Sequence, residues 1–361
     1  MPETAAKEQF ACPACGAGMQ FSPESGQLKC GHCGQTQALI AGSSVVAHEF
    51  TGTVASQALQ PITAQALQVT CTGCGSVVAF EPPEVAGTCS FCGTAIVAQP
   101  KAADPLIAPD GVLPVKVPKQ GALTRLQEWL RSRWFAPNAL KRLARPEGIN
   151  GVYLPFWTYY CHTDSSYVGE RGEHYYETES YTDSDGHRQT REVQHTRWYS
   201  ASGRVQEDFS NVLIPATKAV PEARLNKLEP WDLNALCGYE PAYLAGFRAQ
   251  RYQIELAEGF EKAKIVMGRE IDRSVREDIG GDEQRVSSIS TAYSRIFFLH
   301  LLLPVWIGAY QFRGQVYHVV VNARTGDVEG ERPYSPWKIG TLVVAILAVV
   351  VGLIILYNNN H

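Results

Sequence analysis

Four Cys-x-x-Cys pairs within the first 92 residues constrain this 361-residue chain more than any other feature of its sequence. The pairs form two sets of equal spacing, because fourteen residues separate the pairs within each set, and the sets are offset by 59 residues. Repetition of this kind indicates that one small module has been duplicated. The first set is Cys12, Cys15, Cys30 and Cys33, and the second is Cys71, Cys74, Cys89 and Cys92.

Each set has the spacing of a zinc ribbon with four thiolate ligands. Two residues between the cysteines of a tight turn allow both sulfurs to reach one ion, and a second turn completes a tetrahedral shell. Glycine follows every pair, and it accepts the positive φ that such a turn requires. We therefore expect two structural Zn²⁺ ions with no position open for a catalytic water. His32 lies inside one turn and is expected to stay outside a shell that is already full. The four glycines are Gly16, Gly34, Gly75 and Gly93.

Metal binding explains these cysteines better than disulfide bonding does. The segment from Met1 to Phe10 is polar and lacks the apolar stretch of a secretory signal. Disulfides persist in oxidising compartments, so thiolate zinc sites in a cytoplasm are the preferred interpretation. Cys161 and Cys237 stand in no motif and are expected to be buried thiols.

A few apolar side chains are expected to pack beneath each metal, and each ribbon should unfold without zinc. These residues are Phe21 and Leu28 in the first ribbon and Val78, Phe80 and Val85 in the second.

Charge argues against nucleic-acid binding by the ribbons. The chain carries a net charge of −4, and residues 1–100 hold six acids but only two basic residues, Lys7 and Lys29. Two anionic zinc centres would make this region more negative, whereas phosphate contact needs a basic surface.

An uncharged apolar run of nineteen residues, Ile339 to Tyr357, predicts a membrane-spanning helix. A helix of this length extends about 28 Å, close to the roughly 30 Å hydrocarbon core of a bilayer. Trp337 and Tyr357 bracket it as interfacial anchors. The run contains no GxxxG dimer signal.

The charges beside this run predict its orientation. Arg324, Arg332 and Lys338 precede it, and no basic residue other than His361 follows. The positive-inside rule therefore places the N-terminal bulk in the cytoplasm, with a single pass through the membrane. A second apolar run, Ile296–Tyr310, is shorter and contains a histidine and a proline, so we expect a core strand or another buried element there.

The middle of the chain has the pattern of an α+β body rich in antiparallel hairpins. Long strand-like segments at 167–182 and 188–205 flank the turn signal Asp183–Gly186. Residues 315–321 and 328 flank a second turn. Two helices are expected on the basis of helical spacing. The first carries Leu123, Leu126, Leu130 and Trp134 and ends near Pro137, and the second, over 254–279, carries Phe260, Met267, Ile271 and Val275.

A short repeat lies within this body. Leu154-Pro-Phe-Trp157 resembles Leu303-Pro-Val-Trp306, and a strand-like segment follows each. Paired strands from a duplicated half are one explanation. The expected organisation is zinc ribbon 1–43, linker 44–68, zinc ribbon 69–98, linker 99–118, body 119–336, membrane helix 337–357 and a short tail 358–361.

The stretch from Lys116 to Arg145 is the one basic surface, with eight basic residues and a single acid, Glu128. The simplest interpretation is the solvated face of a core helix. Binding of anionic lipid ranks second, and binding of nucleic acid ranks third.

No catalytic constellation is found in the sequence. A phosphate-binding loop ending in Gly-Lys-Ser/Thr, HExxH, GxSxG and a dinucleotide fingerprint are all missing, so an enzyme is the least supported class. A third metal site can be imagined in the first hairpin, but hairpin polarity explains its residues better. They are His162, Asp164, Glu170, Glu173 and His174.

In order, the chain carries CPxCG and three CxxCG motifs, WLRSRWFAPNALKRL, VYLPFWTYY, LLPVWIGAYQFRGQVYHVVVNARTGDVEGERPYS and the apolar run. This order resembles a bacterial family of membrane-anchored proteins with tandem zinc ribbons of the transcription factor IIB type. Its members are often labelled primosomal protein N′ (replication factor Y) or helicase-like. The resemblance covers nearly the whole chain.

The resemblance implies partners rather than an activity. Relatives tend to be encoded beside SPFH-domain and phage-shock-protein A-type membrane proteins. We therefore expect a non-enzymatic adaptor that docks a protein partner at the cytoplasmic face of the bacterial cytoplasmic (inner) membrane. The alternative is a membrane-associated nucleic-acid-binding protein, related to replication or transcription, that uses residues 116–145.

Overall fold

The computed structural model describes most of the first predicted ribbon, short segments of the second, and most of the body and the C-terminal helix. The described residues are 10, 12–39, 44–50, 59–60, 67–70, 76–80, 86–88, 95–97, 101–102, 106–134, 148–182, 187–312 and 315–359. They form a mixed α+β fold in which most strand pairs are antiparallel.

Small sheets occupy the N-terminal part. The first is a three-stranded antiparallel sheet of β1 (Met19–Ser22), β2 (Gln27–Cys30) and β3 (Thr36–Gln37). The others are β10 (Lys101–Ala102) with β6 (Leu67–Thr70) and β7 (Val77–Phe80); β11 (Leu106–Ile107) with β5 (Leu59–Gln60); and β8 (Ala86–Thr88) with β9 (Ala95–Val97).

A nine-stranded sheet forms the body. Its main path runs through β14 (Arg188–Pro215), β13 (Ile149–Thr182), β17 (Glu283–Phe312), β12 (Gly111–Val112) and β15 (Cys237–Gly238). The remaining strands join at its sides: β4 (His48–Glu49), β16 (Arg248–Ala249), β18 (Gln315–Asn322) and β19 (Val328–Gly330).

Helices complete the fold. They are α2 (Lys119–Ser132), α3 (Glu222–Leu225), α4 (Leu256–Ile279), α5 (Pro336–Asn359) and three 3₁₀ turns, η4 (Asn226–Leu228), η5 (Leu233–Ala235) and η6 (Pro241–Leu244).

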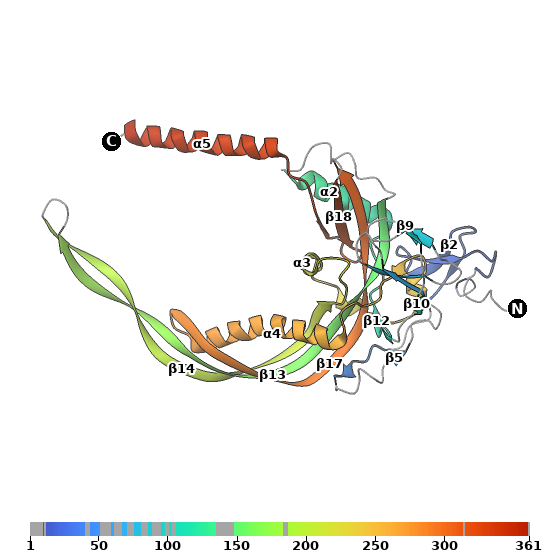
Figure 1. Cartoon of the computed structure of the whole chain (residues 1–361), viewed down its shortest axis with the longest axis horizontal. Helices are drawn as coiled ribbons and strands as arrows, with labels where there is room; N and C mark the ends of the chain where they lie inside the picture. Colours follow the sequence, from blue (N-terminus) through green and yellow to red (C-terminus); the bar gives the residue numbers. More distant parts are fainter. Residues whose placement is uncertain are drawn as a thin grey trace.

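The three long strands curve together, and α4 lies along their concave side (Figure 1). The predicted stripe of α4 is confirmed, because Phe260, Met267, Ile271 and Val275 are all buried against the sheet. The predicted core element at Ile296–Tyr310 is confirmed as part of β17, and the described side chains from Phe298 to Ile307 are buried.

The predicted hairpins are confirmed, but the first is longer than expected. β13 and β14 pair from Phe156↔Pro215 out to Thr182↔Arg188. β17 supports β13 only as far as Gly172↔Glu283. Beyond that point a two-stranded ribbon projects from the body (Figure 1). We call residues 173–182 and 188–197 the distal arm.

The helix predicted around Leu123 forms, but its end was predicted wrongly. α2 stops at Ser132, and Trp134 is 74% exposed rather than part of the buried stripe. Helical spacing identifies a residue's angle around a helix but does not fix where the helix leaves the core.

The two Leu-Pro-x-Trp motifs pair directly, since Leu154 lies opposite Leu303 in the antiparallel β13–β17 ladder. Beside them, Ala216 N–H donates to the carbonyl of Pro155 at 2.9 Å, and Ala323 N–H donates to that of Pro304 at 3.0 Å. The repeat is therefore structural as well as sequential.

The same correspondence extends to the helices. Trp157 Nε1 donates to the carbonyl of Ile254 at 2.8 Å, and Trp306 Nε1 donates to that of Val117 at 2.8 Å. α4 begins two residues after Ile254, and α2 begins two residues after Val117. The body thus contains two helix–strand–strand halves in tandem, α2–β13–β14 and α4–β17–β18. Each helix is anchored by the tryptophan of the other half.

Candidate metal centre and membrane helix

The first four cysteines converge at the tips of two turns in the β1–β3 sheet. Cys12 Sγ lies 3.5 Å from Cys33 Sγ, and Cys15 Sγ lies 3.5 Å from Cys30 Sγ. All four sulfurs lie within 4.8 Å of one another. Sulfurs held about 2.3 Å from one ion in a tetrahedron are about 3.8 Å apart, so this cluster could bind a metal ion such as zinc.

The local backbone explains why the cysteines converge. Gly16 and Gly34 adopt φ values of 73° and 77°, as the sequence predicted. Gly16 N–H donates to the carbonyl of Cys12 at 2.8 Å, and Gly34 N–H donates to that of Cys30 at 3.1 Å. These two equivalent bonds close the two turns.

Backbone dipoles favour the thiolate form most clearly at Cys30. The N–H groups of Cys33 and His32 point at Cys30 Sγ and lower the pKa of Cys30 to about 6. At Cys15 and Cys33 the backbone N–H groups of Ala17 and Gln35 act in the same direction, but hydrogen bonds among the neighbouring thiols and burial raise the pKa overall. The side chain of His32 is exposed and does not belong to the cluster. With four sulfurs present, the cluster is chemically suited to holding an ion rather than to activating a water.

The ribbon rests on the body through its apolar side. Phe21 and Leu28 are buried as predicted, and Met19 joins them. The ring of Phe21 lies 5.5 Å from that of Tyr243 in η6, and Phe21 N–H donates to the carbonyl of Ala245 at 2.9 Å. The ribbon and the body therefore share one hydrophobic cluster.

The second predicted site cannot be compared in this way. Cys71, Cys74, Cys89, Cys92, Gly75, Gly93 and Val85 lie outside the described residues, as do the side chains of Val78 and Phe80. Within the described part of the chain, the first four cysteines are the one candidate metal cluster.

One described helix is long and apolar enough to cross a membrane. The most apolar 18 residues within Pro336–Tyr357 of α5 have a mean hydropathy of 3.1, and none of these 18 residues is buried against the rest of the protein. Trp337 at its start is 81% exposed. An exposed apolar surface of this extent is typical of a segment that contacts lipid.

The start of α5 lies beside the end of α2. Lys338 Nζ donates to the carbonyl of Trp134 at 3.0 Å, and the guanidinium of Arg133 lies 5.0 Å above the ring of Trp129. Part of the basic stretch 116–145 is therefore next to the candidate membrane helix. Residues 135–147 lie outside the described residues.

The imagined third metal site is not assembled, because its members bond to separate partners. His162 contacts Asp208 at 2.8 Å and His174 contacts Glu283 at 2.8 Å. The three acids pair with arginines, Asp164 with Arg204, Glu170 with Arg285 and Glu173 with Arg171. Hairpin polarity accounts for them, as the sequence indicated.

The two remaining cysteines differ. Cys161 is buried, and burial raises the pKa of its thiol. Cys237 is only partly buried, so the expectation of a fully buried thiol was wrong there. Its position in the two-residue strand β15 at the edge of the main sheet path leaves one side open.

Comparison with known proteins yields one distant relative. The chain is 27% identical over 335 residues to the uncharacterized protein YdjG of Bacillus subtilis (strain 168), and the match covers 91% of each protein. No family model matches the chain, and no solved structure matches it. Similarity over most of both proteins supports distant homology and assigns no activity.

Proposed function

We propose that this protein is a non-enzymatic membrane-anchored adaptor of a bacterial cytoplasmic membrane. In this proposal α5 spans the membrane once, and the N-terminal bulk lies in the cytoplasm. Two Zn²⁺ ions hold the ribbons, with Cys12, Cys15, Cys30 and Cys33 binding one and Cys71, Cys74, Cys89 and Cys92 binding the other. The protein then docks a protein partner.

The distal arm is the observation that carries this proposal. It projects beyond β17, and its exposed side chains include Tyr176 and Tyr181, which are 64% and 45% exposed. Arginines stack on the arm's aromatic rings, with Arg197 4.8 Å above Tyr175 and Arg191 5.6 Å above Tyr181. Tyrosine, tryptophan and arginine are enriched among the hot spots of protein interfaces.

The base of the arm is held to the body by hydrogen bonds and a ring contact, which keeps the arm in one orientation for docking. His174 N–H donates to Asp282 at 2.7 Å, and Thr196 Oγ1 donates to Glu283 at 3.0 Å. The guanidinium of Arg285 lies 3.6 Å above the ring of Trp198. Binding at the tip would therefore cost little ordering of the arm.

The class of partner comes from the family resemblance. SPFH-domain and phage-shock-protein A-type proteins are membrane-associated, and a membrane-tethered arm would meet them at the same surface. The partner's identity within these classes is part of the proposal.

A shortened arm tests the proposal. Replacing residues 176–194 with Asn-Gly joins Tyr175 to its ladder partner His195 through a tight turn. Full-length and shortened proteins are isolated gently from native membranes, before and after nuclease treatment, and what remains bound is identified. We expect the full-length protein to retain a defined protein partner after nuclease and the shortened protein to lose it.

Point variants make the test sharper. Tyr176→Ala combined with Tyr181→Ala should weaken partner capture, whereas Tyr334→Ala, which removes a tyrosine that is 58% exposed outside the arm, should not. Zinc content and membrane attachment should be equal in all variants. Nucleic acid bound in stoichiometric amount, with partners lost on digestion, would contradict the adaptor and favour the basic stretch 116–145 instead.

A further inference from the structure

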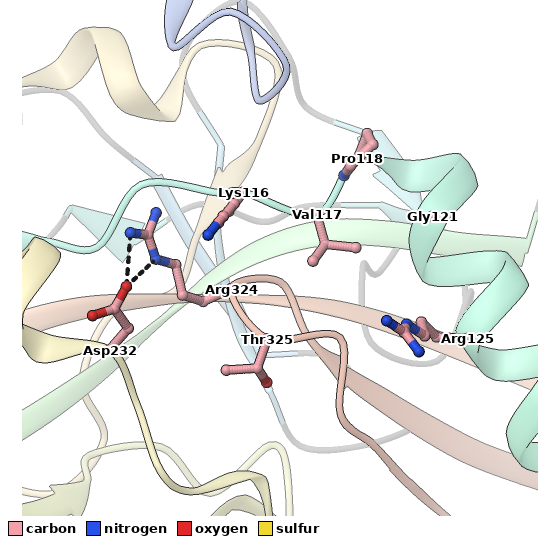
Figure 2. A pocket seen from close by; sticks show the side chains of 8 residues that line it. All are labelled: Lys116, Val117, Pro118, Gly121, Arg125, Asp232, Arg324 and Thr325. Carbon is pink, nitrogen blue, oxygen red and sulfur yellow. Dashed lines mark hydrogen bonds and ion pairs between the residues drawn. The ribbon is translucent and has the colours of Figure 1, made fainter.

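A pocket of about 510 Å³ opens where α2 begins, beside the turn that follows β18. Figure 2 shows Lys116 next to Arg324, and Arg125 of α2 across the hollow. The lining comprises Lys116, Val117, Pro118, Gly121, Arg125, Asp232, Arg324 and Thr325.

The lining has an excess of positive charge. Asp232 is the one carboxylate among the eight described lining residues, and it is committed to Arg324, whose Nε and Nη2 donate to it at 3.0 and 2.8 Å. Arg324 is 15% exposed and also donates to the carbonyl of Pro114 at 3.4 Å. Arg125 also pairs with Glu128, at 3.6 Å on the exposed side of α2, but no carboxylate of the lining pairs with Lys116 or Arg125. Repulsion between the cations of the lining falls when an anion binds between them.

The duplicated half of the body supplies an internal comparison. Lys116 and Val117 N–H groups donate to the carbonyl of Ala323, at 3.0 and 2.8 Å, just as Gln253 and Ile254 donate to that of Ala216 in the other half. By this correspondence, Lys116 occupies the position of Gln253, and Arg324 the position of Thr217.

In that other half, the equivalent position is filled by neutral groups. Thr217 is 3% exposed and donates to Gln250 Oε1 at 2.7 Å, while Lys218 N–H donates to Gln253 Oε1 at 2.8 Å. The corner before α4 is thus closed by hydrogen bonds among neutral side chains, whereas the equivalent corner before α2 has Lys116 and Arg324 around an open pocket. This difference favours a negatively charged ligand for the corner before α2.

The start of α2 adds to the same field. Pro118 caps it without a side-chain hydrogen bond, and its first turn has no acidic residue, whereas the first turn of α4 contains Glu258. The N-terminal end of a helix carries partial positive charge, and here no described carboxylate of the first turn offsets it.

We propose that this pocket binds a phosphate group, either as free phosphate or as the headgroup phosphate of an anionic lipid. Arg125 and Lys116 would contact its oxygens from opposite sides, and Arg324, held in place by Asp232, would complete the positive wall. The proposal is independent of the distal arm, so either can fail without the other.

Lys116→Gln with Arg125→Gln tests the pocket, because both side chains are exposed and their loss should leave the fold intact. Lys218→Gln with Arg269→Gln is the matched control, since it removes the same charge from exposed sites, and Lys218 occupies the position of Thr325 in the other half. The full-length proteins are placed in phosphatidylcholine nanodiscs, and inorganic phosphate is titrated by calorimetry. In a second experiment, part of the phosphatidylcholine is replaced by phosphatidylglycerol and free phosphate is left out. The unfolding temperature of each protein is then measured.

We expect the pocket variant to weaken binding by about tenfold or more, as loss of charged hydrogen bonds does, while the control equals the parent. Binding of inorganic phosphate that the pocket variant weakens identifies a free anion as the ligand. A rise in unfolding temperature that occurs only in phosphatidylglycerol discs, and that the pocket variant lacks, identifies a lipid headgroup as the ligand. If neither probe affects the parent protein, or if the pocket variant and the control weaken binding equally, the proposal is overturned. Equal zinc content and equal unfolding temperature in phosphatidylcholine discs show that the variants fold.

Discussion

Gly259, in the first turn of α4, packs against the aromatic core at a distance that only glycine allows. A Cβ there would lie 2.5 Å from Tyr159 Oη and 2.8 Å from Trp157 Cδ1. We predict that Gly259→Ala lowers the free energy of unfolding by about 1–3 kcal/mol, because both rings must shift. Gly268 on the same helix has open space, so Gly268→Ala should raise it by about 0.5–1 kcal/mol. Urea unfolding measures both, and equal effects would contradict the packing.

A second residue-scale prediction concerns the metal cluster. Cys12→Ser should remove one zinc ion per chain relative to the parent and speed hydrogen exchange in the segment around Tyr243, because ribbon folding depends on the ion. Metal analysis by mass spectrometry and hydrogen exchange check this. Cys161→Ala is the control, since it alters a buried thiol in a different hydrophobic cluster from that of Cys12 and Cys30. Unchanged zinc content in Cys12→Ser would contradict the site.

The cysteines of the first set could be predicted because their geometry is local: spacing and the following glycine decide where each sulfur points. The common pocket of Lys116 and Arg324 could not be predicted, because these residues come together only when the start of α2 packs beside the turn after β18. Arg324 was expected merely as a charge near the membrane helix, yet the structure places it in a pocket wall paired with Asp232.

At the scale of elements, turn chemistry and apolar spacing were sufficient to predict that a helix or hairpin forms but not how long it is. The sequence around Asp183–Gly186 predicts a hairpin, but not that β13 would extend back to Ile149. That length depends on the neighbours β14 and β17, which lie far away in the sequence. The end of α2 was missed for the same reason.

The tryptophan anchors make an element-scale prediction. Trp306→Phe removes the bond to the carbonyl of Val117 and should lower the free energy of unfolding by about 1–2 kcal/mol, because a partly buried acceptor is left without its donor. Hydrogen exchange should quicken in α2 rather than α4. Trp337→Phe, at a site 81% exposed, should change neither quantity. Faster hydrogen exchange in α4 alone would contradict the arrangement in which each helix is anchored by the tryptophan of the other half.

The base of the arm should respond to acid. Bonds from His174 and Thr196 lower the pKa of Glu283, so its contribution to stability is present above the ordinary glutamate pKa of about 4.3. That contribution is lost as pH falls through the depressed folded-state pKa. We predict faster exchange of amides near Gly172 over that acidic range, and Glu283→Gln should flatten this dependence. A pH profile identical in the two proteins would contradict the assignment.

At the scale of the whole molecule, the repeat of Leu-Pro-x-Trp signalled a duplication, but the sequence did not reveal its arrangement. Helix spacing and strand patterns are the same whichever half a helix docks against. The exchange becomes visible only through the bonds from Trp157 to the residue before α4 and from Trp306 to the residue before α2.

Membrane attachment is predicted to depend on α5 and not on the body. Deleting residues 336–359 should release the protein into the soluble fraction with the body's unfolding temperature nearly unchanged, because the described side chains of 339–357 do not pack on it. Replacing 339–357 with an alternating Leu-Ala helix of equal length should restore attachment. Fractionation and thermal unfolding provide the measurements. A deleted protein that stays with membranes would show a second attachment surface.

The directions of α5 and the distal arm together limit how the protein can stand at a bilayer. Figure 1 shows both extending from the body toward the same side. The arm carries charges such as Arg191 along its length, and an arginine would cost about 2.5–3.5 kcal/mol at the centre of the hydrocarbon. If α5 spans the membrane upright, the arm stays out of the hydrocarbon only when the body is turned relative to α5. Residues 332–335 connect the two, after the ion pair of Glu331 with Arg224. The arm would then lie parallel to the membrane surface, where it could contact only partners bound to that same surface.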